Sequence, residues 1–453
     1  MSRSNSVEKK AQELWQPMTH PGSVQDDPPI AITSAKDVFI TDANNQTVLD
    51  AVGGLWNVNL GYSCQSIKDA IAQQLQELPY YSSFRGVTTD KTLELSRNLT
   101  NWFGEEQMGR AFFTSGGSDS VETALRLARQ YHKIRGDKDR YKFIGLKKGY
   151  HGTHFGGASI NGNVKFRRNY EPYLPGCFHV SCPWTYRNPF NEEKSDRLAQ
   201  LCAQQLEDEV ISQSPDTVAA VIMEPVLGAG GVIVPDSSFM PLVREICDNH
   251  GILLIADEVI TAFGRTGAWT GSRLWNVQPD LMCLAKALTN GYFPLGATMI
   301  SEKVVDTFET NTDGAGEINH GYTYSGHPVG AAAALAVLEE LKTNDLATNS
   351  SLRGKELAQG LAKLKEAHRW IGDARGIGLM HALELVSDRS AKTALDKNSM
   401  ALVGQEIYNN GVMVRISGNN MILSPPLIIT DQHVKNILDA IDAGLSALTK
   451  QHD

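Results

Sequence analysis

Short apolar stretches alternate with helical patterns through the middle of the chain, from about residue 107 to residue 300. Apolar strands separated by helices are typical of a mainly parallel sheet covered on both faces, because such strands have no side that faces solvent. Ligand sites in these sheets lie at the carboxyl ends of the strands, and here polar residues follow the apolar ones. The stretches that we predict to be strands are RAFFT (110–114), KFIGL (142–146), VAAVIMEPV (218–226), GILLIADEVI (251–260) and DLMCLAKAL (280–288).

The last part of the chain has a different pattern. HPVGAAAALAVLEELK (327–342) predicts a helix, and the alternating runs GVMVRI and MILSPPLII flank a hairpin turn at SGNN (417–420). Thr430 can cap a final helix. One face of that helix would be apolar, with Val434, Ile437, Leu438, Ile441, Leu445 and Leu448.

These patterns predict an α/β protein with two domains. The large domain would span residues 71–326 and contain the mainly parallel sheet, covered by helices. The smaller α+β domain would take residues 327–453 and also residues 1–70, from the other end of the chain. A chain of 453 residues with 42% hydrophobic residues is long enough to bury such a core.

Composition narrows the class of protein. The formal net charge is −9 and no block of Lys or Arg stands out, so we expect no nucleic-acid or anionic-membrane partner. There is no apolar signal core and no stretch near the roughly 18 apolar residues of a membrane span, which favours a cytoplasmic location. The six cysteines are scattered. Cys177, His179 and Cys182 form the tightest group, but no second ligand pair lies nearby, so we expect no metal site.

Two carboxylates, Asp257 and Glu258, end the apolar run LLIADEV. A strand that ends this way can hold Mg²⁺ in an ATPase, or it can face a cationic cofactor. The ATPase also needs a glycine-rich loop with a lysine, and Gly354-Lys355 lacks the required context. Neither GAGG (228–231) nor GIG (376–378) fits a dinucleotide motif, and no G-x-S-x-G elbow of a serine hydrolase occurs.

The segment FFTSGGSDSVETALRLARQYH (112–132) predicts a strand, a glycine-rich turn and a helix. Gly116 and Gly117 let the backbone approach an anion, Ser118 adds a hydroxyl, and the helix N-terminus points its amides at the site. This arrangement suits one phosphate group. The alternative is an ordinary helix cap without a ligand.

Lys286 lies among apolar residues in DLMCLAKALTNG. Burial would lower its pKa and free its lone pair for a carbonyl, as a Schiff-base lysine requires; the alternative is a lysine that reaches the surface. A phosphate cradle, an aldehyde-reactive lysine and a buried carboxylate match the three groups by which a protein holds pyridoxal 5′-phosphate (PLP): its phosphate, its aldehyde and its ring nitrogen. These three groups are called its handles below. Asp257 would pair with the ring nitrogen of PLP, while Glu258 would point to the opposite face.

Four motifs together resemble the class III, fold-type I aminotransferases: SGGSDS, YHG (150–152), DEVITAFGRTG and Lys286, 29 positions after Asp257. The resemblance extends from about residue 30 to the C-terminus. It implies a PLP-dependent transferase of fold type I and a homodimer with shared active sites, with a tetramer left open.

The resemblance also implies roles for individual residues. Gly117 and Ser118 would bind the phosphate, together with Thr323 from the partner subunit. Tyr150 would stack on one face of the PLP ring and Val259 would press on the other. Glu224 would support the cofactor site, although a buried acid there can also serve only local hydrogen bonds, and His151 is expected to be structural.

Substrate residues point to the ω-aminotransferase branch. Trp56 and Phe84 resemble pocket walls of pyruvate-dependent enzymes, and Arg415 resembles an arginine that accepts a substrate carboxylate; each of the three could instead be an ordinary core or surface residue. Ornithine- and GABA-type relatives carry a glutamate where this chain has Ala229.

We therefore expect transfer of the amino group of a primary amine or ω-amino acid to pyruvate, which gives alanine and an aldehyde or ketone. Lys286 would move the proton in this ping-pong reaction. A mutase, a decarboxylating relative, a 2-oxoglutarate-dependent aminotransferase and a non-catalytic PLP-binding protein are the alternatives. The segment with Lys165, Arg167 and Arg168 does not map onto known pocket residues, so the amine stays open.

Overall fold

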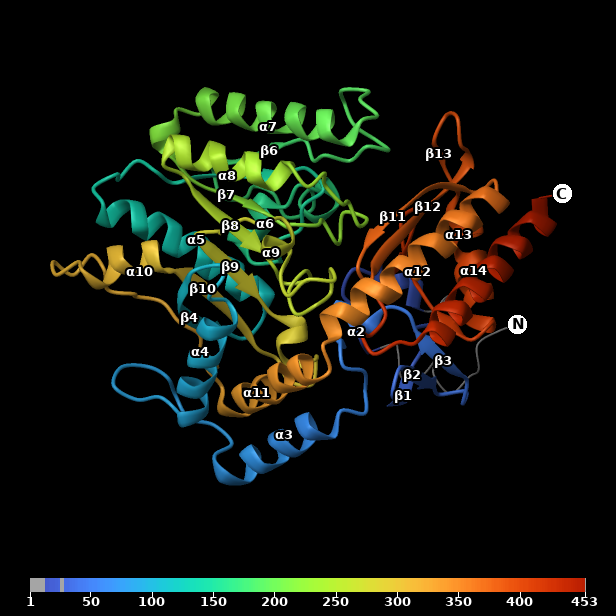
Figure 1. Cartoon of the computed structure of the whole chain (residues 1–453), viewed down its shortest axis with the longest axis horizontal. Helices are drawn as coiled ribbons and strands as arrows, with labels where there is room; N and C mark the ends of the chain where they lie inside the picture. The colour runs from blue at the N-terminus through green and yellow to red at the C-terminus, as the bar shows by residue number, and fades with distance from the viewer. Residues whose placement is uncertain (1–12, 25–27, 453) are drawn as a thin grey trace.

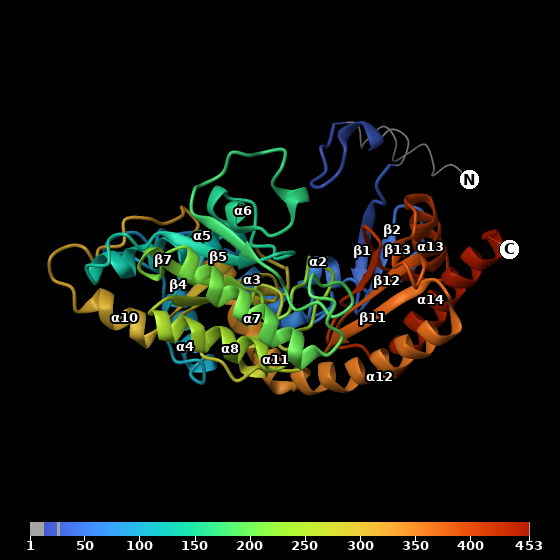
Figure 2. The ribbon, with the colours of Figure 1, turned by 90° about the horizontal axis from the view of Figure 1, so that it is seen from above.

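The structure is a computed structural model that describes residues 13–24 and 28–452. Its elements form two groups, one around a seven-stranded sheet and a smaller one that contains both ends of the described chain (Figure 1). The two groups lie next to each other along the long axis of the molecule, and α12 (Leu346–Ala367) runs along the smaller one (Figure 2). The first twelve residues of the predicted range 1–70 lie outside the described residues.

The large sheet is mixed but mainly parallel, as predicted. Only β10 runs antiparallel to its neighbours β4 and β9, whereas the other pairs from β9 to β6 are parallel. The order of strands across the sheet is β4 (Met108–Thr114), β10 (Gly296–Ser301), β9 (Leu281–Leu284), β8 (Leu253–Asp257), β7 (Val218–Met223), β5 (Lys142–Leu146) and β6 (Cys177–Val180).

Helices cover both faces of this sheet, which explains the unbroken apolar character of its strands. In β8, Leu253 and Ile255 pack on one face, while Leu254 and Ala256 pack on the other. The first face is covered by α5 (Gly117–Ile134) and α10 (Glu302–Glu309), and the second by α7 (Ser195–Ser212), α8 (Phe239–His250), α4 (Asp90–Trp102) and α11 (Pro328–Thr343).

Four strands end earlier than the apolar pattern predicts: β7 at Met223, β9 at Leu284, β8 at Asp257 and β16 at Leu423. In β8 the chain turns after Asp257, whose Oδ1 accepts a hydrogen bond from the Val259 amide at 3.2 Å, so Val259 and Ile260 lie in a turn. The last strand of the hairpin, β16, stops at Leu423. Pro425 and Pro426 follow it, and proline has no N–H to donate to a sheet.

The smaller group joins residues from the two ends of the chain, as predicted. Residues Val412 and Met413 of β14 pair in parallel with Leu49 and Asp50 of β3. Its first sheet contains β1 (Ile32–Lys36), β2 (Phe39–Asp42), β3 (Thr47–Asp50) and β14 (Val412–Met413), and its second contains β11 (Ile371–Ile377), β12 (Met380–Asp388), β16 (Asn420–Leu423), β15 (Arg415–Ser417) and β13 (Thr393–Ala394). The helices α12, α13 (Lys397–Asn409) and α14 (Asp431–His452) pack against these sheets.

The position of α11 bears on the division into domains. This helix packs against α3 (Gln65–Glu77) and α4 on the side of the large sheet, at the bottom of Figure 1, whereas α12 packs on β11 and α14. The division into residues 1–70, 71–326 and 327–453 therefore stays a proposal, with α3 and α11 next to each other at its two boundaries.

Short helices complete the chain, and several lie beside the ends of sheet strands. They are α2 (Gly53–Trp56), α6 (Phe155–Ile160), α9 (Gly271–Leu274), and the 3-10 helices η1 (Pro21–Val24), η2 (Val164–Phe166), η3 (Pro215–Thr217) and η4 (Lys286–Thr289). None of the helices within residues 13–24 and 28–452 combines the length and apolarity needed to cross a bilayer.

A buried arginine fastens the smaller group to the loop after β8. Arg265 is fully buried, and its guanidinium donates to the carbonyl oxygens of Leu379 (2.8 Å) and Pro425 (2.6 Å) and to Oδ1 of Asn59 (2.6 Å). Burial lowers the pKa of Arg265 to about 9. Because a buried cation is costly unless its donors are satisfied, these three acceptors fix the loop relative to both chain ends.

The contact between α12 and the turn after β11 provides a test of the packing. A methyl group at Gly354 would lie 2.0 Å from the backbone oxygen of Gly378. Alanine normally stabilises a helix relative to glycine by about 1 kcal/mol. Gly354→Ala should instead lower the free energy of unfolding by about 1–3 kcal/mol, because the backbone must shift.

Denaturant unfolding of the two proteins measures this difference. Gly404→Ala in α13 is the matched control, because its new methyl group would meet only the Ile416 side chain, at 3.2 Å. We expect no loss of stability in the control. A stable Gly354→Ala protein would contradict the described contact.

Candidate active site

The predicted phosphate cradle forms between β4 and α5. β4 ends at Thr114, and the turn through Ser115 and Gly116 leads into α5 at Gly117, so the first amides of an 18-residue helix face the end of the sheet. A side chain at Gly117 would press on Val259, at 3.0 Å. One at Gly152 would come within 2.5 Å of the Ser118 hydroxyl. Glycine at these two positions keeps the cradle open.

Asp257 ends β8 and is nearly fully buried. Its Oδ2 lies 2.8 Å from Nδ1 of His151, and its Oδ1 accepts from the Val259 amide. Both oxygens are therefore held by neighbouring groups, which fixes the plane of the carboxylate. Glu258 points elsewhere: its oxygens accept from the amides of Gly271 (2.8 Å) and Ser272 (2.6 Å).

Lys286 follows β9 and begins η4, with a backbone φ of +51°. This left-handed conformation is uncommon for a residue other than glycine, and such strain is typical of functional positions. Burial lowers the pKa of Lys286 and Arg415 lowers it further, while the carboxylates of Asp257 and Glu224 act in the opposite direction. The side chain is thus an amine that loses its proton more easily than a surface lysine.

Glu224, just after β7, connects two parts of the site. Its Oε1 accepts from the Tyr150 amide at 2.9 Å, and its Oε2 accepts from the Gly228 amide at 2.8 Å. Burial raises the pKa of Glu224 to about 7, an effect that Asp257 strengthens and His151 opposes. The carboxyl group positions Tyr150, whose ring lines the same cavity as Lys286.

Arg415 approaches this cavity from the smaller group of elements. It is half-buried in β15, and burial lowers its pKa. Arg415 and Tyr150 interact electrostatically: the arginine lowers the pKa of the tyrosine, against the larger effect of burial, which raises it. A cation from the smaller group of elements therefore lies near the ring of Tyr150, which belongs to the larger group.

The cradle, the strand-end carboxylates and the lysine line one cavity of about 400 Å³. Its lining includes Gly117, Ser118, Tyr150, His151, Glu224, Asp257, Val259 and Lys286. The volume lies in the range of small-molecule and cofactor sites, which runs from about 300 to 1,000 Å³. The cradle, the strand-end carboxylate and the lysine are arranged around it as the three handles of PLP require, so the donor set fits this cofactor.

Besides Arg415, three predicted residues do not line this cavity within one chain. Thr323 is exposed, and Phe84, 48% exposed, lines a separate hollow with Phe112 and His320. Trp56 is 3% exposed and packs in a core cluster, so that its neighbour Asn57 lines the cavity instead. The roles assigned to these three residues stay predictions.

Two contacts at the site were not predicted, one of His151 and one of Phe166. His151, which belongs to the YHG motif and was expected to be structural, holds Asp257 directly, and its Nε2 is buried without a hydrogen-bond partner among the described residues. Phe166 lies between Lys165 and Arg167, and its ring packs edge-on against Tyr150, with centroids 5.0 Å apart. The adjacency of His151 to Tyr150 was a signal in the sequence, whereas Phe166 had none.

The structure also gives the places of the remaining charged and thiol groups. Arg167 is half-buried, and its Nη1 lies 3.8 Å from Oε1 of Glu171. Lys165 and Arg168 are exposed. All six cysteines are free thiols. Within the described ranges, no group of three or more His, Cys, Asp or Glu side chains is placed to hold a metal ion.

The fold and the cavity together define a PLP enzyme of fold type I. The family model described as "Aminotransferase class-III" matches residues 22–445 of the chain. The protein therefore belongs to the class-III aminotransferases and is a PLP-dependent transaminase.

Individual relatives agree with this assignment. The chain is 36% identical to the putrescine–pyruvate aminotransferase of Pseudomonas aeruginosa, over 90% of this chain and 88% of that one. It is 34% identical to gamma-aminobutyrate transaminase 1 of Oryza sativa subsp. indica, over 98% and 87%.

Solved structures match over nearly the whole chain. An amine transaminase from an uncultivated Pseudomonas species, in its PLP-bound form, is 44% identical and has a TM-score of 0.95, covering 96% of this chain and 99% of that one. A thermostable omega transaminase variant with a tryptophan, a phenylalanine and an arginine substituted, engineered for asymmetric synthesis of enantiopure bulky amines, is 32% identical, with a TM-score of 0.94 and coverage of 98% and 99%.

The raised pKa of Glu224 predicts a pH dependence of stability. Between its ordinary pKa of 4.5 and its native value of about 7, the folded protein binds more protons than the unfolded chain. The contribution of Glu224 to stability is therefore complete below 4.5 and is lost as the pH rises through about 7. Glu224→Gln removes this titration and keeps the shape of the side chain.

Denaturant unfolding of protein stripped of ligand, at pH values below, within and above this window, measures the effect. We expect the free energy of unfolding of the wild type, relative to that of Glu224→Gln, to fall as the pH rises across the window. A difference independent of pH would contradict a raised pKa at Glu224.

Proposed function

We propose that the protein is an ω-aminotransferase that moves the amino group of a primary amine or ω-amino acid to pyruvate, producing alanine and an aldehyde or ketone. The observation that carries this proposal is that Lys286 and Asp257 line one cavity, with Arg415 close enough to lower the pKa of Lys286. An amine with a lowered pKa and a fixed carboxylate serve the transamination chemistry, and a cation beside them suits a substrate carboxylate.

The residues of the site have separate tasks in this reaction. PLP, when bound, supplies an aldehyde that exchanges amino groups and a ring that withdraws electrons. The Asp257 carboxylate, oriented by His151 and Val259, keeps a proton on the ring nitrogen. Nζ of Lys286 would carry the proton between the substrate carbon and the aldehyde carbon of the cofactor.

The walls of the cavity position the reacting groups. Tyr150 and Val259 confine the ring of the cofactor from two sides, and Gly117 and Ser118 bind its phosphate at the N-terminus of α5. Arg415 binds the carboxylate of pyruvate or of an ω-amino acid as a bidentate pair. Ornithine- and GABA-type enzymes carry a glutamate at the position of Ala229. The absence of this glutamate favours pyruvate over 2-oxoglutarate as the amino acceptor.

Trp56, Phe84 and Arg415 are proposed as the substrate-binding set. The tryptophan, phenylalanine and arginine substituted in the engineered omega transaminase variant have the same spacings along its chain as these three residues have here. That variant was engineered for bulky amines, so the correspondence supports a role for these positions in fitting the amine substituent.

We propose that the protein is a homodimer whose subunits share their active sites. Tyr80 and Tyr324 pack with ring centroids 5.9 Å apart, and the Phe84 ring lies against Gly321. Together with the exposed Tyr81, these residues form an aromatic surface beside Thr323. Exposed aromatic surface of this kind is typical of an interface, which would bring Phe84 and Thr323 to the cavity of the other subunit.

The free state of all six thiols suits a reducing compartment, and we propose a cytoplasmic location on this ground.

The amine is the remaining element of the function. β-Alanine, a diamine, taurine and an aralkyl amine are the candidate donors.

A panel of these donors against pyruvate and 2-oxoglutarate tests the proposed reaction. We expect at least one donor to bleach the yellow colour of the holoenzyme, and pyruvate to restore it with formation of alanine. Conversion of a substrate without any oxo acid would instead indicate a mutase.

Lys286→Ala should lose essentially all turnover, because no other group of the described site is placed to carry the proton. Lys303→Ala is the matched control: Lys303 forms an ion pair with Asp280 outside the cavity, at 2.8 Å. Normal turnover in Lys286→Ala would remove the assignment of this lysine.

Hybrid dimers test the sharing of active sites. Thr323→Asp places a negative charge beside the phosphate, so it should inactivate the enzyme by itself. When Lys286→Ala and Thr323→Asp subunits are mixed after dissociation, each hybrid dimer regains one intact site if Thr323 acts across the interface. We expect about a quarter of the wild-type activity, since half of the dimers are hybrids with one of two sites intact.

Activity of the mixture, compared with that of each variant alone, is the measurement. Analytical ultracentrifugation of the same samples gives the oligomeric state. If Thr323 acted within its own chain, mixing would restore nothing.

A further inference from the structure

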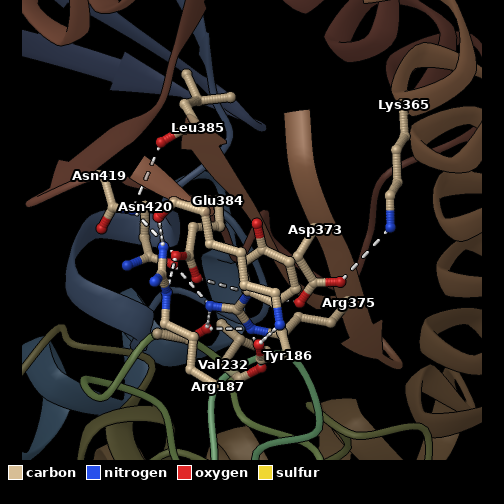
Figure 3. A network of polar contacts seen from close by, with 12 residues as sticks. Tyr186, Arg187, Val232, Lys365, Asp373, Arg375, Glu384, Leu385, Asn419 and Asn420 are labelled. Carbon is tan, nitrogen blue, oxygen red and sulfur yellow. Dashed lines mark hydrogen bonds and ion pairs between the residues drawn. The ribbon is translucent and has the colours of Figure 1, made fainter. Parts of the chain in front are cut away.

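Arg375 lies where the small domain meets the turn that follows Glu224. Its guanidinium donates to the carbonyl oxygen of Gly231 through Nε (2.9 Å) and Nη2 (2.6 Å), and Nη2 also donates to Oδ1 of Asn420 (2.7 Å). Figure 3 shows these contacts converging on Arg375 from β16 and from the turn at Val232, whose carbonyl oxygen lies 3.2 Å from Nε. One side chain therefore joins two domains.

On the large-domain side, the contacts lead to the ring of Tyr150. The amide of Gly231 donates to the oxygen of Gly228 at 3.0 Å, and the amide of Gly228 donates to Oε2 of Glu224 at 2.8 Å. Oε1 of Glu224 then accepts from the amide of Tyr150. A displacement of the turn would reach Tyr150 through three hydrogen bonds.

On the small-domain side, the contacts lead to Arg415. Asn420 begins β16, which pairs antiparallel with β15: Ser417 lies opposite Asn420, and Arg415 lies opposite Ile422. Arg375 thus holds the hairpin that carries Arg415 at Asn420, the first residue of the second strand. Tyr150 and Arg415 form the two ends of this path, and they are close enough to interact electrostatically.

The junction is built to hold one geometry. Asp373 (2.8 Å) and Glu384 (3.5 Å) balance the charge of Arg375, and the ring of Trp184 lies 5.1 Å from its guanidinium carbon. Gly231 has a φ of +113°, and a side chain there would come within 3.0 Å of Nη2. A planar guanidinium can serve these acceptors together, whereas a lysine ammonium cannot reproduce the fork.

We propose that Arg375 is a positioning residue that sets where Arg415 stands relative to Tyr150, and that it thereby determines the preference for substrates with a carboxylate. The inference rests on the proposed function, in which Arg415 binds that carboxylate. An amine without a carboxylate needs Lys286, Asp257 and Tyr150 but not Arg415. Its reaction therefore does not use the hairpin that the junction holds.

β-Alanine and propylamine test this inference, because they differ only in the carboxylate. The measurement is kcat/KM for bleaching of the holoenzyme by each amine, in the wild type and in Arg375→Lys. We expect the ratio of the β-alanine value to the propylamine value to fall about tenfold or more in Arg375→Lys, since a displacement of about 1 Å in a binding group can cost up to a hundredfold. The propylamine value itself should stay within about twofold, because its reaction does not use Arg415.

Arg187→Lys is the matched control. Arg187 belongs to the same network through Oε1 of Glu384 (2.6 Å), but it bonds neither the turn at Gly231 nor Asn420 in the structure (Figure 3). Each of the two substitutions keeps the charge, so long-range electrostatics are matched. The control should leave the ratio unchanged.

A double variant separates positioning from general damage. In an Arg415→Ala background, Arg375→Lys should have no further effect on the ratio, since the group that it positions is gone. Equal loss with both amines would show only a structural role for Arg375 and would overturn the inference, as would a preserved ratio. If Arg415→Ala left the ratio of the wild type unchanged, the proposed role of Arg415 would fail, and the role of Arg375 would fail with it.

Discussion

The enclosure of ionisable groups at the end of a buried sheet is the constraint on which the site depends. Asp257, Glu224 and Lys286 leave water together: Asp257 raises the pKa of Glu224, and both carboxylates raise that of Lys286 against the larger effect of burial. Burial alone would raise the pKa of a carboxyl and lower that of an amine. Their proximity in one cavity, with His151 against Asp257, keeps an acid and a reactive amine side by side near neutral pH.

The parallel sheet explains how residues far apart in the chain supply this site. β7 ends just before Glu224, β8 at Asp257 and β9 just before Lys286, and neighbouring parallel strands end at the same edge. The phosphate cradle joins them because β4 lies at the end of the sheet beside β10, with α5 folded back across the strands. The chemistry is therefore distributed over single residues, each fixed by a rigid strand end.

Arg265, which is buried, and Arg375, which is half-buried, connect the smaller group of elements to the larger one. Arg265 reaches Leu379 and Pro425 through backbone oxygens, and Arg375 reaches the turn at Gly231 in the same way. A guanidinium that bonds main-chain oxygens depends on the path of the backbone rather than on a partner side chain. The position of the smaller group of elements, which carries Arg415, therefore depends on these two residues.

The sequence by itself determined the type of fold, the cofactor and the residues of its three handles. Apolar strands buried on both faces leave a periodicity that can be recognised, and Gly117, Asp257 and Lys286 belong to local motifs whose residue types reflect their chemistry. Only the tertiary structure decided that His151 holds Asp257, that Phe166 packs on Tyr150, that β8 stops at Asp257 and that Trp56 lies in the core. These facts depend on distances between segments separated along the chain, and neither periodicity nor a local motif carries such distances.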